Sequence, residues 1–217
     1  MSRFQNPYGR CAVPGCTVVP VSWSRWCTRH TQRRQQHGHI SALGLRDVDL
    51  RRHREAIRHT LAELSEAPAV VAAHHEADRL LNFHAPFGSS RPTKEIEARM
   101  RQLRAEQTVA REVLQAVCEV LFVEHDDHFH DLRSVQYALA RQVCKLRGLH
   151  KWRPGTLMLG ALGALLHDRF AVFALALRKR IEADADEARK RKDAMQHGWA
   201  VAHVDDNDDE GADDDAE

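Results

Sequence analysis

The chain has 217 residues, of which 43% are hydrophobic and 29% charged, and its formal net charge at pH 7 is +1. This hydrophobic content supports a globular core and excludes a wholly disordered chain. Only eleven Gly and seven Pro occur, beside abundant Ala, Leu, Arg and Glu. The composition therefore argues against a β-sandwich or barrel and predicts a mainly α-helical protein of one or two domains.

The small net charge hides three segments of different charge. The first sixty residues contain eleven Arg against three carboxylates, a net charge of +8, and residues 61–204 carry +2. The last thirteen residues, 205–217, contain nine carboxylates and no basic residue. Asymmetry of this kind is typical of a protein with a polyanionic partner or an interaction tail. We therefore expect a basic head, a nearly neutral body and a disordered acidic tail over 205–217.

Four residues with metal-binding side chains lie close together near the N-terminus. They follow the spacing Cys-x4-Cys-x10-Cys-x2-His and are Cys11, Cys16, Cys27 and His30. Zn²⁺ prefers four tetrahedral nitrogen and sulfur ligands, which two short-range pairs can supply. The first ten residues lack the apolar run of a secretory signal, so we expect a reducing, cytoplasmic setting where clustered cysteines hold metal. The spacing predicts a zinc site, with His37 or His39 as the alternative fourth ligand.

Residues 1–40 are expected to form a small module around this zinc. Thr17–Trp23 is rich in Val, Thr and Trp and predicts a short β-hairpin. Thr28–His37 predicts a helix that ends at Gly38, with the second ligand pair at its start. A knuckle, a hairpin and a ligand-bearing helix in this order are typical of a treble clef. A segment of this size cannot fold on apolar burial alone, so the metal would supply folding energy.

The module resembles a zinc-binding type found in mobile elements. Pro14-Gly15-Cys16, Trp26-Cys27-x-x-His30 and His37-Gly38 are similar to the module near the N-terminus of phage HNH endonucleases and other mobile-element DNA-binding proteins. The resemblance covers about thirty residues, and it says little about function because such modules are appended to many proteins. It implies the four ligands named above, and it implies that Arg33 and Arg34 lie on a basic helix near DNA.

The catalytic residues of those endonucleases have no clear counterpart here. Their chemistry needs a His base, a metal-holding His or Asn, and a ββα frame. The nearest candidates are His74, His75, Asn82 and His84. They are too close together for a hairpin and lie in, or just after, a predicted helix over Ala69–Leu81. We therefore expect a non-enzymatic protein and keep an HNH-like nuclease as a minor alternative.

Two groups of arginines make the head basic. The first group surrounds the zinc ligands and consists of Arg25, Arg29, Arg33 and Arg34. The second lies in a predicted helix, Val48–Leu64 with Asp47 as N-cap, where it forms one stripe beside an apolar stripe. That stripe consists of Arg51, Arg54 and Arg58. Arginine binds phosphate bidentately, so both groups predict contacts with a nucleic-acid backbone. The alternative is a solvated face, or pairing with the acidic tail.

The helical domain is expected to span 41–204, with a loop near 83–92 that subdivides it. A long helix from Thr93 to Glu124 is predicted after this loop, because seam positions recur with a period of 3.5 residues. The seam positions are Ile96, Met100, Leu103, Gln107, Ala110, Leu114, Val117 and Leu121. Such a seam packs in an antiparallel bundle, which we favour, or in a homodimeric coiled coil.

Two further helices are predicted in the C-terminal half. The first begins at its N-cap Asp131 and ends at its C-cap Gly148. The second is a helix or a helix pair that runs from Thr156 to about Gln196, and its first half is apolar all round, which predicts the central buried helix. They are not expected to form a DNA-binding helix-turn-helix, because the second presents almost no polar side chains at its start.

The apolar half of that last helix is long enough to cross a membrane. A charged triplet, His167-Asp168-Arg169, lies at its middle. Charge at the centre of a bilayer is costly, so we expect a buried helix of a soluble protein and no membrane partner. Gly160 and Gly163 would allow a neighbouring helix to approach closely.

A His-rich segment, Glu124–Asp131, is the one other candidate site. His125, His128 and His130 have the side chains of a second metal or acid–base site. No matching His or Glu motif recurs on another helix, as a metal site in a bundle needs. The end of one helix and the cap of the next explain the segment without a site, and we favour this interpretation.

Together these patterns favour a zinc-dependent DNA-binding accessory or regulatory protein from a phage or mobile element. In this hypothesis the arginine groups contact phosphates, and the helical body offers a surface to a protein partner such as a recombinase, or to a second copy in a homodimer. No pattern distinguishes DNA from RNA or names the bases read. The alternative is a protein–protein adaptor in which zinc is structural.

Overall fold

The computed structural model describes residues 9–20, 24–42, 44–126, 128–148 and 154–205. Within these ranges the chain forms seven α-helices, one short 3-10 helix and no strand, which confirms the expected mainly α-helical class. The helices are α1 (Thr28–His37), α2 (Asp47–Glu63), α3 (Pro68–Leu81), α4 (Arg91–Ala105), α5 (Ala110–Glu124), α6 (Leu132–Cys144), η1 (Leu146–Gly148) and α7 (Thr156–Asp205). The chain divides into two compact units, residues 1–177 and 178–217.

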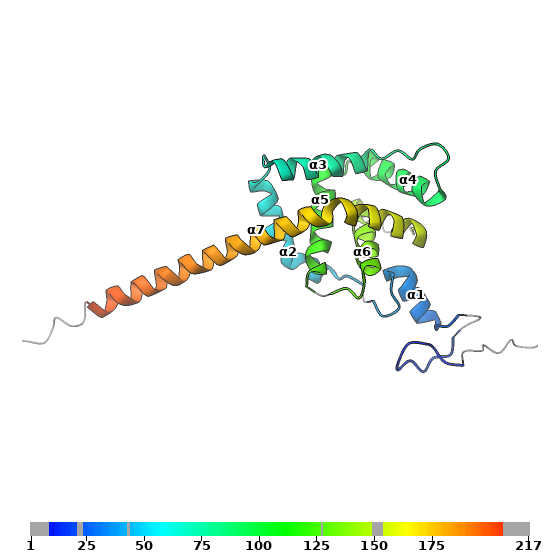
Figure 1. The fold of residues 1–217 in the computed structure, drawn as a ribbon, viewed down its shortest axis with the longest axis horizontal. Coiled ribbons are helices and arrows are strands. Elements are labelled where there is room, and N and C mark those ends of the chain that lie inside the picture. The colour runs from blue at the N-terminus through cyan, green and yellow to red at the C-terminus, as the bar shows by residue number, and fades with distance from the viewer. Residues whose placement is uncertain (1–8, 21–23, 43, 127, 149–153, 206–217) are drawn as a thin grey trace, which may run out of the picture. The chain divides into compact units, whose positions relative to one another are not determined.

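Helix α5 is the central helix of the first unit (Figure 1). All its side chains from Val113 to Val123 except Gln115 are buried, and it packs against α2, α3 and α6. The prediction that α7 is the central helix is therefore wrong. Leu157 and Val172 of α7 are 75% and 81% exposed, so this helix buries one face only. The many Ala and Gly residues of α7 have little apolar surface to bury, whereas Val, Leu and Phe cover every face of α5.

The long helix predicted over Thr93–Glu124 is two helices, α4 and α5. Gln107 adopts a left-handed conformation with φ 59°. The Thr108 N–H donates to the Leu103 carbonyl at 3.0 Å, which closes the end of α4 in the manner of a Schellman motif. Glu112 then accepts from the Val109 N–H at 3.1 Å and begins α5. Gln107 and Ala110, at the break itself, are exposed and half-buried, but the three seam positions before them and the three after them are buried. The period therefore marked two core faces and not one continuous helix.

Helix α6 begins as predicted and ends earlier than predicted. Asp131 caps it by accepting from the Ser134 N–H at 2.8 Å and the Ser134 hydroxyl at 2.6 Å. The helix ends at Cys144 and not at Gly148. The buried Arg99 of α4 donates to the Cys144 carbonyl, so a side chain from another helix occupies the C-terminal end. The left-handed residue beyond it is Arg147, with φ 63°.

The first part of α7 packs closely on α6. A Cβ atom added at Gly163 would overlap the backbone carbonyl of Gln136, whereas one at Gly160 would lie 3.7 Å from Tyr137. The predicted close approach is therefore confirmed, and Gly163 provides it. Two residues of the charged triplet have partners: Arg169 pairs with Glu76 at 2.9 Å, and His167 lies 3.6 Å from Glu124.

By length and composition, part of α7 could also cross a membrane. The segment is Thr156–Met195, and 39% of its most apolar window is buried. Core helices of soluble proteins meet the same criterion, so the segment by itself distinguishes neither case.

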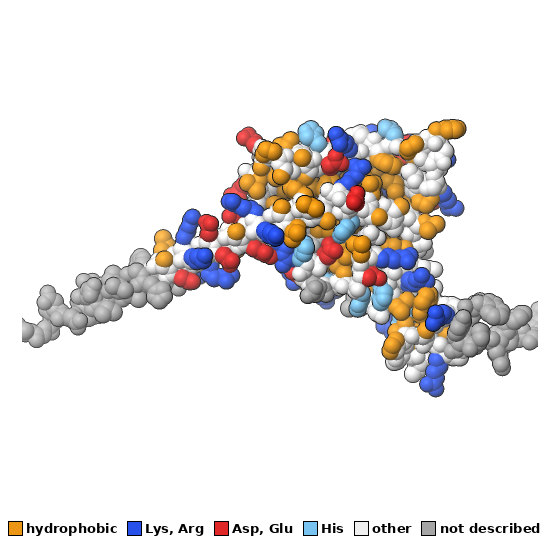
Figure 2. Space-filling model, viewed as in Figure 1, with side chains coloured by type: hydrophobic (Ala, Val, Ile, Leu, Met, Phe, Trp, Pro, Cys, Tyr) orange, Lys and Arg blue, Asp and Glu red, His pale blue; other side chains and the backbone are white. Residues whose placement is uncertain are grey.

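In the second unit, α7 is highly charged. Ion pairs one turn apart join Arg178 to Glu182 at 2.7 Å and Arg180 to Asp184 at 2.9 Å. Figure 2 shows acidic and basic side chains interspersed along this part of the helix. Such pairs support an exposed helix that has no apolar face to bury. The predicted acidic tail, 205–217, lies outside the described residues beyond Asp205.

Candidate metal centre and the arginines around it

A tight turn places the first two cysteines of the motif together. The Cys16 N–H donates to the Val13 carbonyl at 3.1 Å, and Gly15 has φ 76°, a conformation that favours glycine. The Cys11 N–H then donates to Val18 at 3.2 Å, which folds the following segment back over the turn. Thr17–Pro20 is not a strand, and the rest of the predicted hairpin, residues 21–23, lies outside the described residues.

Helix α1 supplies the other two candidate ligands. Cys27 is the residue before its first turn and His30 lies within that turn. The Cys27 N–H points at the Cys11 sulfur, 3.4 Å away, so the helix start is already joined to the turn. At the other end Gly38, with φ 82°, stops the helix as predicted, and its N–H donates to the Arg34 carbonyl at 3.0 Å.

The four ligand atoms form one compact cluster. They lie within 4.8 Å of one another and belong to Cys11, Cys16, Cys27 and His30. The His30 Nδ1 atom is 3.2 Å from the Cys11 sulfur and 3.3 Å from the Cys27 sulfur, and the Cys16 and Cys27 sulfurs are 4.0 Å apart. Tetrahedral zinc with ordinary Zn–S and Zn–N bonds separates its ligand atoms by roughly 3.5–3.8 Å. Small adjustments would therefore place all four around a single ion.

The surroundings of Cys11 favour its thiolate, which is the form of cysteine that binds a metal. Burial would raise the pKa of Cys11, but hydrogen bonds from the Cys27 and Val13 backbone and from His30 outweigh it and lower this pKa to about 6. The pKa of Cys16 is raised, because burial and the Cys11 and Cys27 thiols outweigh the hydrogen bond with the Val18 backbone. Crowded thiols of this kind share protons until a cation replaces them.

The alternative fourth ligands lie elsewhere. His37 packs against Gly44 and borders a cavity of about 50 Å³ beside Arg141 and Lys145. Burial, then the positive charges of Arg141, Lys145 and Arg33, lower the pKa of His37. The ring of His39 lies 5.1 Å from that of His130. Neither joins the cluster, so His30 is the histidine that the geometry selects.

The His-rich segment does not form a second cluster. Among the described residues, the cysteine–histidine cluster is the only group of three or more potential ligands close enough for one ion. His125 is exposed, and His128 packs edge-on against Phe129. The residues considered for nuclease chemistry are also separated: His74 and His75 lie on α3, Asn82 bonds to Asp78 and Arg104, and His84 contacts Glu97. No strand frames them in the described part of the chain.

The four arginines predicted around the metal ligands have no carboxylate partner among the described residues. The four are Arg25, Arg29, Arg33 and Arg34. Arg25, Arg29 and Arg34 are exposed, and Arg33 is half-buried. Arg34 lies over the Trp26 ring at 4.6 Å, which orients the guanidinium without neutralising it. This group therefore presents its positive charge to the surroundings.

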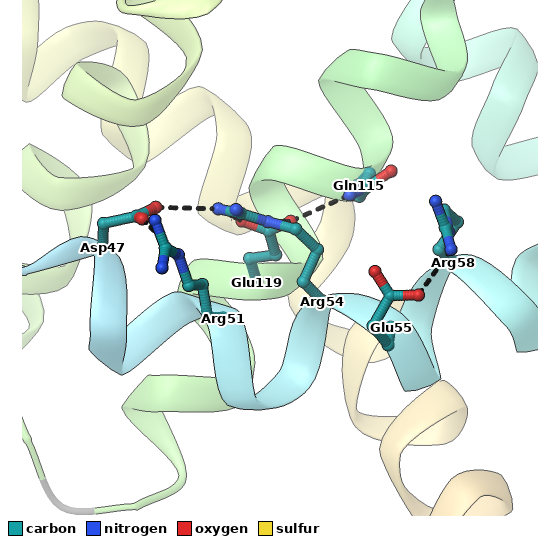
Figure 3. A network of polar contacts seen from close by, with 7 residues as sticks. All are labelled: Asp47, Arg51, Arg54, Glu55, Arg58, Gln115 and Glu119. Carbon is teal, nitrogen blue, oxygen red and sulfur yellow. Dashed lines mark hydrogen bonds and ion pairs between the residues drawn. The ribbon is translucent and has the colours of Figure 1, made fainter.

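The three arginines of the predicted stripe on α2 are all ion-paired within the protein (Figure 3). Arg51 pairs with Asp47 at 2.6 Å and Arg58 with Glu55 at 2.5 Å, both one turn away on the exposed helix face. Asp47 is the first residue of α2 and not its predicted N-cap. Arg46 holds that position, and its N–H donates to Asp49 at 3.0 Å. The arginine stripe that was predicted to contact phosphates is thus neutralised, because each of its arginines has a carboxylate partner within the protein.

Arg54 turns inward from that stripe to a buried carboxylate. Its Nε and Nη2 atoms donate to the two oxygens of Glu119 at 2.9 and 3.2 Å, and Nη2 also reaches Asp47 at 3.2 Å. Glu119 is 3% exposed and also accepts from Gln115 at 2.9 Å. The hydrogen bond to Glu119 is the main reason that the pKa of Arg54 is raised. This arginine joins α2 to α5.

Three basic residues near α1 were not predicted as site residues. Arg133 and Arg141 lie on α6, which packs against α1, and Lys145 is the residue that directly follows α6. None of them has a carboxylate partner among the described residues. The sequence gives little indication that these three residues belong to a site, because basic residues are common on the surface of helices. Only the packing of α1 on α6 shows that they extend the basic group around the candidate metal centre.

Comparison with family models, curated proteins and solved structures gave no match to this chain. The cluster is therefore assigned from its own geometry: three thiols and one imidazole suited to a single metal ion.

Proposed function

We propose that the Cys3His cluster binds Zn²⁺ and that this ion holds the N-terminal module in its folded form. Three sulfurs and one nitrogen are a typical set for structural zinc, and they leave no open position for catalysis. Cys11 is 7% exposed, Cys27 1% and His30 9%, so an ion here is shielded from solvent. The turn with two ligands and the helix start with two more support the likeness to a treble clef.

We propose further that the protein binds nucleic acid, with DNA as the expected partner, through this zinc module. The observation that carries the proposal is the difference between the two arginine groups. The arginines around the zinc site have no carboxylate partner among the described residues, whereas those of α2 are paired. Unpaired guanidinium groups beside a rigid metal site are suited to phosphates, because they exchange only water and counterions when they bind.

A binding assay with matched variants tests this proposal. Fluorescence anisotropy at low salt would compare the zinc-loaded protein with Arg29→Gln/Arg34→Gln and with the control Arg51→Gln/Arg58→Gln. Each pair removes two positive charges from exposed arginines. We expect the first pair to weaken DNA binding by at least tenfold and the control by less than threefold. Absence of binding by the zinc-loaded wild-type protein would refute the proposal, and equal losses would refute the role of the zinc-module arginines.

The second candidate is the protein–protein adaptor, and one observation favours it. Helix α7 exposes apolar side chains in the first unit, among them Leu157 and Val172, with Leu175 38% exposed. Exposed apolar residues on one helix are typical of an interaction surface, either with another protein or with a second copy. Light scattering on Val172→Glu against the wild type would test it: a homodimer that becomes a monomer supports this surface.

A further inference from the structure

A cleft separates the zinc module from the helical body within the first unit. It encloses about 350 Å³ and is lined on one side by residues 24–35 and on the other by α6 and the start of α7. The lining residues are Ser24, Trp26, Thr31, Arg34, Gln35, Arg133, Tyr137 and Thr156. The volume lies at the lower end of the roughly 300–1,000 Å³ range of small-molecule sites. A group the size of one nucleotide is therefore within its capacity.

The zinc-module wall of the cleft is held in place by local hydrogen bonds. The Trp26 N–H donates to the Ser24 hydroxyl at 3.1 Å, and the Thr31 hydroxyl donates to the Trp26 carbonyl at 3.4 Å. Trp26 directly precedes the candidate ligand Cys27, so the metal fixes its backbone as well. Its half-buried ring carries Arg34 on one face. This wall offers an aromatic surface and a cation.

The opposite wall, on the helical body, also combines an arginine with an aromatic ring. The Arg133 guanidinium lies 5.5 Å from the centre of the Tyr137 ring, and its Nη2 donates to the Tyr137 hydroxyl at 3.4 Å. That hydroxyl donates in turn to the Thr156 carbonyl at 2.9 Å. Tyr137 is buried, so it acts as a fixed support for the exposed Arg133.

The two walls are held at a fixed spacing. A Cβ atom at Gly38 would lie 2.9 Å from the Arg133 carbonyl oxygen, so the end of α1 rests directly on the backbone of α6. No carboxylate lines the cleft, and neither Arg34 nor Arg133 has one as a partner in the described part of the chain. Two cations thus face the same space with no counterion among the residues that the structure describes, beside the side chains of Gln35 and Thr31, which can form hydrogen bonds.

We propose that this cleft binds one unpaired nucleotide, so that the protein recognises single-stranded nucleic acid. The inference rests on the proposed nucleic-acid binding and names its ligand class. Arg34 and Arg133 would hold the phosphates on either side, and the base would lie in the cleft beside Trp26, where aromatic and guanidinium faces favour stacking. Duplex DNA offers phosphates but keeps its bases stacked inside the helix, so it cannot use the volume between the walls.

The experiment compares a single-stranded oligonucleotide with a hairpin duplex of the same composition, both by fluorescence anisotropy on the zinc-loaded full chain. The variants are Arg133→Gln and Trp26→Leu, and the control is Arg111→Gln, another exposed arginine without a carboxylate partner among the described residues. Bound zinc, measured on each variant, shows that the module has folded. A second readout uses 5-bromodeoxyuridine in the single strand, cross-linked by light and mapped by mass spectrometry.

We expect the single strand to bind more tightly than the hairpin. Trp26→Leu should weaken single-strand binding by about 5- to 100-fold, the range for loss of one stacked base. Arg133→Gln, which loses a phosphate contact, should weaken it by about fivefold or more, while the control changes it by less than twofold. The cross-link should map to residues 24–35 or to α6. Tighter binding of the hairpin, or single-strand affinity unchanged in both cleft variants, overturns the inference but leaves the proposed function intact. Failure of both oligonucleotides to bind overturns both.

Discussion

The Arg54–Glu119 pair gives the sharpest test of the packing between α2 and α5. Replacing Arg54 with Ala would leave the carboxylate of Glu119, which is 3% exposed, with Gln115, at 2.9 Å, as its one remaining donor among the described residues. Removing one member of a buried ion pair costs about 3–5 kcal/mol, because the other charge stays buried. The Arg54 side chain is 32% exposed, so water can partly replace it. We therefore expect the lower end, about 3 kcal/mol.

A matched variant on the same helix provides the control. Arg58 pairs with Glu55, but the two side chains are 59% and 73% exposed. Exposed pairs contribute little, so Arg58→Ala should cost less than about 0.5 kcal/mol. The double variant Arg54→Met/Glu119→Leu replaces both charges with apolar groups of similar size. It should be close to the wild type, because the buried charge is removed together with its partner.

Urea denaturation at a fixed zinc concentration measures these differences as shifts in midpoint at constant slope. A loss of 3 kcal/mol corresponds to about 6–12 °C in Tm for a chain of this length. Equal effects of Arg54→Ala and Arg58→Ala would refute the reasoning, because Glu119 would then be solvated. A double variant as unstable as Arg54→Ala would also refute it, because the cost would come from packing and not from charge.

Three further predictions concern other parts of the first unit. Gly163→Ala should destabilise the protein by about 2 kcal/mol or more in urea, because a Cβ atom there overlaps α6, whereas Gly160→Ala should stabilise it by up to about 1 kcal/mol through helix propensity. Cys27→Ser should lower bound zinc, measured by mass spectrometry, and should reduce helix content in circular dichroism as α1 loses its anchor. Burial and neighbouring cations lower the pKa of His37 in the folded protein from 6.5. The unfolded chain therefore binds more protons below that pH, so the free energy of unfolding should decrease as the pH is lowered below 6.5. The fall should be smaller in His37→Gln; an identical pH profile would contradict the assignment.

The cluster of three cysteines and one histidine could be predicted because its determinants are local. Cys11 and Cys16 share one turn, Cys27 and His30 share one helix start, and only the chain reversal between them is long-range. Asp131 was predicted as a cap for the same reason, since its partner Ser134 is three residues away. Spacing is sufficient evidence when the contacts span a few residues.

The break between α4 and α5 has no such local signal. The left-handed position is held by Gln107, where Gly or Asn is usual, and the N-cap of α5 is Val109, whose side chain cannot accept a hydrogen bond. Apolar seams on the two helices happen to continue one another in phase. Tertiary packing therefore overrides a pattern that is locally consistent with a single helix.

The role of each arginine was equally beyond the reach of the sequence. Arg54 and Glu119 are 65 positions apart, and Arg34 meets Arg133 at the cleft only because α1 packs on α6. The periodicity of α2 correctly predicted which residues share a stripe. It could not show that the stripe lies beside a buried carboxylate, since that depends on the placement of α5.

The salt dependence of binding separates the two arginine groups in a single titration. Five of the arginines without a carboxylate partner among the described residues are the proposed phosphate contacts: Arg25, Arg29, Arg33, Arg34 and Arg133. If each of them neutralises one phosphate, the slope of log K against log salt should be about −3.5 for a single strand, since each contact contributes about −0.7. If Arg51, Arg54 and Arg58 also exchanged their carboxylates for phosphates, the slope would steepen to about −5.5. Arg54 would then have to leave Glu119 buried and unpaired, at the cost worked out above. A slope near −5.5 that Arg51→Gln/Arg58→Gln reduces would show that the α2 ion pairs open on binding, and would refute the division of the arginines into a structural group and a binding group.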